Sequence, residues 1–199
     1  MRRSSATSKP LNFHAEPDTL ETGKKISDVF LYDHGTLDTV PKYAFFNKEG
    51  YPEKRKTSLG HYMTILGGVT VVSGELKRVL EQFELGATAF YPLPLFEYDQ
   101  RTRRLDELFI LYVAETKDTV VSEQSMGVRS VGTSEFFRPK SDSLVALNKN
   151  ACSGADLWRE RRMRDDWYFS DRLHKALQDS QLLDAKPAVL TFKPCKIIG

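Results

Sequence analysis

The sequence predicts an α+β domain in which a mixed or antiparallel sheet carries two helices that begin at serine residues. Three observations support this fold class. Short apolar and β-branched runs recur along the chain, and two segments place apolar residues at helical spacing directly after a serine. The composition is that of an ordinary globular protein, with 40% hydrophobic and 28% charged residues in a chain of 199.

The first 26 residues differ in composition from the rest of the chain. They are rich in Ser, Thr, Pro and charged residues and contain few large apolar side chains. We expect residues 1–26 to be a flexible tail and residues 27–199 to form a single α+β domain. Residues 1–25 carry five basic and three acidic side chains, so they hold the whole net charge of +2. The remaining body is neutral, which argues against a nucleic-acid partner, because nucleic-acid-binding domains are normally basic.

The next segments predict two strands and the first helix. Residues 29–32 and 69–72 are short β-branched or aromatic runs typical of strands. Ser73 can accept a hydrogen bond from a first-turn amide, so we expect a helix over residues 73–84 that it caps. Its apolar stripe at helical spacing is formed by Leu76, Val79, Leu80 and Phe83.

The middle of the chain predicts further strands. Residues 87–96 are extended but contain two prolines, which cannot donate to a ladder, so this segment is an edge strand at best. The unbroken apolar run at 108–114 predicts a strand buried on both faces. Residues 119–121 and 144–148 predict shorter strands.

The C-terminal part repeats the arrangement of strand, serine and helix. Residues 156–158 predict a strand, and the charged stretch 159–166 predicts a solvent-facing link to the apolar residues 167–169. Ser170 is expected to cap a helix over residues 170–180, and a last strand follows at 189–192.

An internal match links the two helical segments. Residues 72–80 and 169–177 share the pattern of apolar residue, serine, two polar residues, leucine, two polar residues, small apolar residue and leucine. Two related sub-units would explain this match. Chance would also explain it, because many amphipathic helices begin in this way.

No catalytic, metal or cofactor site is predicted. The histidines are scattered without ligand spacing, and no glycine-rich phosphate loop or nucleophile elbow is present. An enzyme using the carboxylates within residues 97–107 or the thiol of Cys152 stays open as an alternative. Two cysteines without paired spacing indicate a reducing compartment, hence the cytoplasm, and no apolar run is long enough to span a membrane.

Several motifs together resemble a known family. They are residues 156–159 (Asp-Leu-Trp-Arg), residues 168–173 (Tyr-Phe-Ser-Asp-Arg-Leu) continuing to Leu177, the helix start at 71–73, and the strand at 108–113. Over residues 60–195 this pattern is similar to the eleventh of the bacterial immunity-protein families associated with polymorphic toxins. The matching residues are expected to be structural, as core and cap positions: Ser73, Trp158, Ser170, Leu173 and Leu177.

The resemblance implies a cytoplasmic, non-enzymatic bacterial protein that binds and neutralises a cognate toxin or secreted effector in interbacterial competition. No binding residue is carried over with it. Two turns that hold several long cations are our candidates for partner binding. Their arginines are Arg101, Arg103 and Arg104 in the first turn, and Arg161, Arg162 and Arg164 in the second. An enzyme that reverses a toxin's modification, or a secretion adaptor that binds through the basic tail, are the alternatives.

Overall fold

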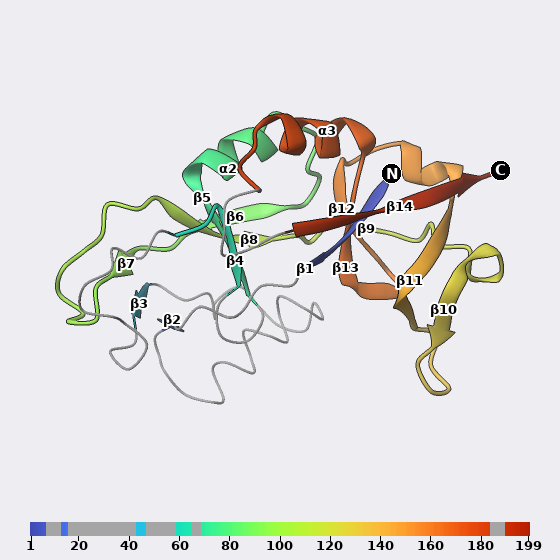
Figure 1. Ribbon diagram of the computed structural model, residues 1–199, viewed down its shortest axis with the longest axis horizontal. Coiled ribbons are helices and arrows are strands. Elements are labelled where there is room, and N and C mark those ends of the chain that lie inside the picture. Colours follow the sequence, from blue (N-terminus) through green and yellow to red (C-terminus); the bar gives the residue numbers. More distant parts are fainter. Residues whose placement is uncertain (7–12, 16–42, 47–58, 65–68, 184–189) are drawn as a thin grey trace.

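The computed structural model describes residues 1–6, 13–15, 43–46, 59–64, 69–183 and 190–199 (Figure 1). Within these ranges the chain forms mixed sheets and two α-helices, which confirms the α+β fold class. In the same ranges, no helix combines the length and the apolar character that crossing a membrane requires.

The largest sheet has seven strands and mixed pairing. In spatial order the strands are β10 (Met126–Ser130), β11 (Phe137–Asn148), β14 (Leu190–Ile198), β1 (Arg2–Ala6), β13 (Met163–Phe169), β12 (Leu157–Glu160) and β9 (Thr116–Lys117). β11 pairs with β14 in parallel, and so does β12 with β9, whereas the other neighbours are antiparallel.

β1 lies inside this sheet, between β13 and β14 (Figure 1). Arg2 pairs with Phe169 on one side and with Pro194 on the other, so both edges of β1 are used. A flexible tail was expected here, and residues 2–6 differ from that expectation. Except for β2 (Phe13–Ala15), the remainder of residues 7–26 lies outside the described residues, so the domain boundary at residue 26 stays a prediction.

A second sheet has four antiparallel strands and contains the apolar run predicted at 108–114. β8 (Leu108–Tyr112) lies between β5 (Thr70–Ser73) and β6 (Ala89–Pro92). The last three residues of β8 are buried one after another, as expected of a strand covered on both faces. β6 is an edge strand, as the two prolines within residues 87–96 predict. The order is β4 (Tyr62–Thr64), β5 (Thr70–Ser73), β8 (Leu108–Tyr112) and β6 (Ala89–Pro92), and a smaller sheet joins β2 (Phe13–Ala15), β3 (Ala44–Phe46) and β7 (Leu95–Phe96).

The two helices begin directly after serines and lie side by side (Figure 1). Before α2 (Gly74–Leu80), Ser73 Oγ accepts from the Leu76 amide at 3.1 Å. Before α3 (Asp171–Asp179), Ser170 Oγ accepts from the Leu173 amide at 3.1 Å. α2 is shorter than the predicted 73–84, because the amides of Gln82 and Phe83 turn to donate three residues back.

The matched positions of the two helical segments have the same environment. Leu76 and Leu80 of α2 and Leu173 and Leu177 of α3 are buried in one apolar cluster, together with Val72 and Phe169 from the preceding strands. The related sub-units stay a prediction, but the equivalent residues cap and bury their helices in equivalent ways.

The charged stretch 159–166 is not the solvent-facing link that the sequence predicts. β12 continues to Glu160 and β13 begins at Met163, so a tight hairpin replaces the link. Arg159 and Glu160 are both buried. The predicted strand at 144–148 is the end of β11, residues 119–121 form only an isolated bridge from Val120 to Leu147, and residues 29–32 lie outside the described residues.

Aromatic side chains fill the core beside this hairpin. Trp158 and Phe169 are 0% and 2% exposed, so Trp158 occupies the core position that the sequence predicts for it. The indole of Trp158 stacks on the ring of Tyr168, with 5.9 Å between centroids. Trp158 belongs to an apolar cluster on one side of the large sheet, and Phe169 belongs to the apolar cluster beneath the helices. β12 and β13 therefore contribute side chains to both clusters.

Candidate functional site

The segment between β7 and β8, residues 97–107, is a protruding turn that we call the tip (Figure 1). Backbone contacts close it at its base. Phe96 forms an antiparallel bridge with Arg103, and the Glu97 amide donates to the Thr102 carbonyl at 2.8 Å. The Arg104 amide donates to the Leu95 carbonyl at 2.8 Å. The tip is therefore an ordered hairpin-like turn.

Asp99 shapes the turn from within. One oxygen, Oδ1, accepts from the amides of Arg101 at 2.9 Å and Thr102 at 2.8 Å, and Oδ2 accepts from the Thr102 hydroxyl at 2.6 Å. An aspartate that binds the following amides stabilises a turn of this kind. The hydrogen bonds from the Thr102 hydroxyl and amide, and then from the Arg101 amide, lower the pKa of Asp99, so this carboxylate is ionised and satisfied internally.

Arg104, a predicted partner-binding residue, is bound within the tip instead. Its Nε donates to Asp106 Oδ2 at 2.6 Å, and its Nη1 lies 3.5 Å from Glu97 Oε1. Only 18% of the Arg104 side chain is exposed. Arg104 therefore positions the tip, and the exposed arginines of this segment are Arg101 and Arg103.

The tip also exposes apolar side chains. Leu105 is fully exposed, at 101% of its reference area, and Tyr98 is 42% exposed. Tyrosine and arginine are common energetic anchors of protein interfaces, and an exposed leucine adds apolar area that binding can bury. The tip thus combines, within eight residues, the side chains that a protein-binding surface needs.

The second predicted arginine cluster lies at the turn from β12 to β13. Arg162 is bound internally: its Nε donates to Asp118 Oδ1 at 3.0 Å and its Nη2 to the Val120 carbonyl at 2.7 Å. Its guanidinium also lies 5.6 Å from the ring of Phe137. Arg161 is exposed, whereas Arg164 lies in β13 and its side chain is not among those described.

The fold keeps the two arginine clusters apart. The tip lies beyond β7 at one end of the long axis in Figure 1, whereas the β12–β13 hairpin belongs to the large sheet. The two clusters therefore do not form one continuous basic surface. Sequence alone could not separate them, because both are arginine-rich turns flanked by acidic residues.

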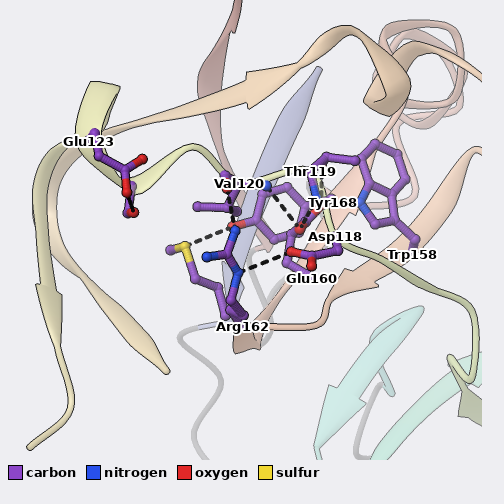
Figure 2. Close-up of polar contacts among 10 residues, drawn as sticks. Asp118, Thr119, Val120, Glu123, Trp158, Glu160, Arg162 and Tyr168 are labelled. Carbon is purple, nitrogen blue, oxygen red and sulfur yellow. Dashed lines mark hydrogen bonds and ion pairs between the residues drawn. The ribbon is translucent and has the colours of Figure 1, made fainter. Parts of the chain in front are cut away.

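A buried carboxylate that the sequence did not reveal lies beside the second cluster (Figure 2). Glu160 is 0% exposed and accepts from several donors. Its Oε2 accepts from the amides of Thr119 at 2.9 Å and Val120 at 3.3 Å. Its Oε1 accepts from Trp158 Nε1 at 2.9 Å and from the Thr119 hydroxyl. Glu160 therefore attaches the segment 118–120, which also holds Arg162, to the hairpin.

Burial raises the pKa of Glu160, and the hydrogen bonds from Thr119, Trp158 and Val120 oppose this rise without cancelling it. One signal in the sequence could have indicated the arrangement. Residues 158 and 160 lie on the same face of a strand, and a buried indole N–H needs an acceptor. The hydrogen-bond partners of the Glu160 carboxylate among the described residues are all donors, so Glu160 acts as a structural anchor.

Lys117 is a second anchored charge in this region. Its Nζ donates to the carbonyls of Ser153 at 2.7 Å and Ala155 at 2.8 Å, and it lies 3.9 Å from the centre of the Trp158 ring. Burial lowers the pKa of Lys117, although nearby carboxylates, Glu115 first, oppose the shift. The ammonium group fixes the loop at 151–155 against β9.

The remaining candidates for chemistry lack a catalytic arrangement within the described residues. No group of three potential metal ligands occurs there. His61 Nδ1 lies 2.9 Å from Ser73 Oγ and 3.3 Å from Glu75 Oε2, so one ring nitrogen faces both groups. A serine–histidine–acid relay needs both nitrogens, and Ser73 already caps α2. Cys152 is an exposed free thiol.

Comparison with protein-family models finds a match over residues 2–196 to the family described as immunity protein family (Imm11). The match begins with β1 and reaches into β14, so it includes the N-terminal strand that the motifs at 60–195 did not cover. Comparison with curated proteins finds no match to this chain.

Proposed function

Because this chain belongs to the Imm11 immunity protein family, we propose that it protects a bacterial cell by binding one cognate toxin and blocking it. The family match over residues 2–196 is the observation that carries this proposal. The protein acts in the cytoplasm as a stoichiometric inhibitor and not as an enzyme, and its partner is a protein and neither a nucleic acid nor a membrane.

The expected binding is tight, for a kinetic reason. A toxin is a catalyst, so even a small free fraction damages the cell, and protection requires slow dissociation. Nanomolar affinity corresponds to about −12 kcal/mol. An interface of roughly 1,600 Å² with a few aromatic or arginine anchors supplies that free energy. Blocking the toxin's active site is the simplest way for such an interface to neutralise it.

Five of the six arginines predicted as contacts divide into two groups in this proposal, and Arg164 stays a prediction. Arg101, Arg103 and Arg161 are exposed and are the contact candidates. Arg104 and Arg162 are held by Asp106 and Asp118, so they position the turns that present the others.

Co-expression with the product of the adjacent toxin gene tests the function. We expect co-elution in size-exclusion chromatography at a fixed stoichiometry and rescue of growth. Separate elution without rescue contradicts the proposal. Rescue without a complex identifies an enzyme that reverses the toxin's modification instead.

A further inference from the structure

We propose that the tip, residues 97–107, is the part of the chain that enters the toxin, with Leu105 and Tyr98 in an apolar pocket and Arg101 and Arg103 against its acidic rim. This inference rests on the proposed function and adds to it the docking element and the chemistry of the partner surface.

The first argument is the direction of Leu105. Arg104 and Asp106, its two neighbours, are joined to each other through Arg104 Nε and Asp106 Oδ2 at 2.6 Å. Alternate side chains of an extended segment point to opposite sides. The ion pair therefore holds its two members on one side of the backbone and leaves Leu105 on the other, where it is fully exposed. The same contact that removes Arg104 from the surface presents Leu105 to solvent.

The second argument is the charge that the tip presents outward. Its sequence holds four carboxylates and three arginines, which suggests an acidic segment. The structure distributes these charges unevenly. Arg104 binds Asp106 and Glu97, Glu107 lies 3.0 Å from Arg78 Nη1, and Asp99 is held within the turn by Thr102. Arg101 and Arg103 are exposed, so two guanidinium groups lie close together at the surface of the turn, where they can match an acidic partner surface.

The third argument is rigidity. Gln100 has a φ of 55°, and its amide donates to the Glu97 carbonyl at 2.9 Å, which closes the turn on itself. Side chains on such a turn lose little conformational freedom on binding, because the backbone is already ordered. A preformed, protruding turn with exposed apolar side chains fits a concave site, and an enzyme's active-site cleft has this shape.

The β10–β11 hairpin is the rival surface, because it also exposes apolar and basic residues. Met126 is 69% exposed, and Arg129 is exposed as well. However, Met126 begins β10 and the exposed Val131 lies just past its other end, and Arg129 pairs directly across from Arg138. The hairpin therefore offers separate residues and not one compact group, and it supplies matched control substitutions.

The experiment measures binding of the variants to a catalytically inactive form of the adjacent toxin gene's product. The tip variants are Leu105→Ala and the double variant Arg101→Glu with Arg103→Glu. The controls are Met126→Ala and Arg129→Glu in the hairpin. All five substitutions in these four variants are at exposed positions, so unchanged melting temperatures verify that the fold is intact.

We expect Leu105→Ala to weaken binding about tenfold or more, because the variant loses most of the apolar area that Leu105 buries in the complex. The double arginine variant is expected to slow association and to remove most of the salt dependence of the on-rate, because it removes the attraction to an acidic surface. The hairpin controls should bind like the unmodified protein.

Two different failures are distinguishable. If the unmodified protein does not bind the toxin, the proposed function fails and the inference fails with it. If it binds tightly and both tip variants bind equally well, the immunity function stands and the tip is not the docking element. Loss of binding in the hairpin controls alone overturns the inference in favour of the β10–β11 hairpin.

Discussion

Asp156 and Arg172 form an ion pair that joins the start of β12 to the first turn of α3. Arg172 Nε donates to Asp156 Oδ1 at 2.6 Å, and Arg172 Nη2 contacts the other oxygen, Oδ2. Asp156 Oδ2 also accepts from the Glu84 amide at 3.0 Å, just beyond α2. The Ser170 amide donates to the Asp156 carbonyl at 2.8 Å. One buried aspartate therefore connects both helical segments to the large sheet.

The first prediction concerns this connection. Asp156→Ala leaves the Glu84 amide without its acceptor and should lower the free energy of unfolding by about 1–3 kcal/mol, as loss of a hydrogen-bonded buried carboxylate does. Arg172→Ala should cost less, because the Arg172 side chain is 66% exposed and solvent screens its charge. Urea denaturation at neutral pH measures both changes. Equal losses would mean that the exposed guanidinium supplies most of the stabilisation.

The second prediction is the acid dependence of the same pair. Burial alone would raise the pKa of Asp156, but hydrogen bonds from Arg172, Ser170 and the Glu84 amide outweigh it and lower the pKa. The stabilisation is therefore present above the unfolded-state pKa of about 3.9 and is lost as the pH falls through the lower folded-state pKa. Denaturation between pH 5 and pH 2 should show less acid sensitivity in Asp156→Asn. An identical pH profile in the variant would exclude this group as a source.

The third prediction concerns Glu160. In Glu160→Gln the new amide cannot accept from Trp158 Nε1 while its oxygen serves the Thr119 and Val120 amides, so we expect a loss of about 1–3 kcal/mol. Trp158→Phe removes the indole N–H that the new amide leaves without an acceptor. Adding it to Glu160→Gln should therefore recover part of this loss in a double-mutant cycle. Additive losses in the cycle would contradict the direct contact.

The pH profile of Glu160 has the opposite sign to that of Asp156. Burial raises the folded-state pKa of Glu160, so the folded protein holds this proton more tightly than the unfolded chain. The free energy of unfolding then declines as the pH rises from about 4.3 through the raised folded-state pKa. Glu160→Gln removes this decline, and stability measured from pH 4 upward checks it.

The fourth prediction concerns the serine caps. Ser73→Ala and Ser170→Ala should each lower the free energy of unfolding by about 1 kcal/mol, because each removes the acceptor of a first-turn amide. Ser73→Asp and Ser170→Asp, which retain an acceptor, are the matched controls. Thermal or urea melts that do not change in the alanine variants would show that water replaces the caps without cost.

The fifth prediction concerns β1, which is a strand of the large sheet although the sequence predicts a flexible tail there. Ser4 pairs with Trp167 in β13 and with Phe192 in β14. Ser4→Pro removes a backbone donor from the middle of the sheet and should cost about 2 kcal/mol or more, whereas Ser4→Ala keeps that donor. Equal melting temperatures for both variants, together with rapid proteolytic removal of residues 1–6, would contradict this prediction and support the flexible tail expected from the sequence.

Local sequence patterns predict the features that depend on neighbouring residues. The β-branched residues of β5 and the apolar run of β8 indicate strands, and Ser73 and Ser170 indicate helix starts, because these signals come from local backbone preferences and periodicity. The motifs around Trp158 and Leu173 also indicated the family for the same reason, since they are short and contiguous.

Which charges are buried, paired or exposed depends on contacts that form across the folded chain. Glu160 meets Thr119 and Arg162 meets Asp118 across long separations in the chain, so no local pattern distinguishes them from solvated residues. β1 likewise finds its partners near the other end of the chain, where β13 and β14 leave a gap between them. The free energy of placing a charge or an unpaired strand depends on what surrounds it in space, and folding alone brings those surroundings together.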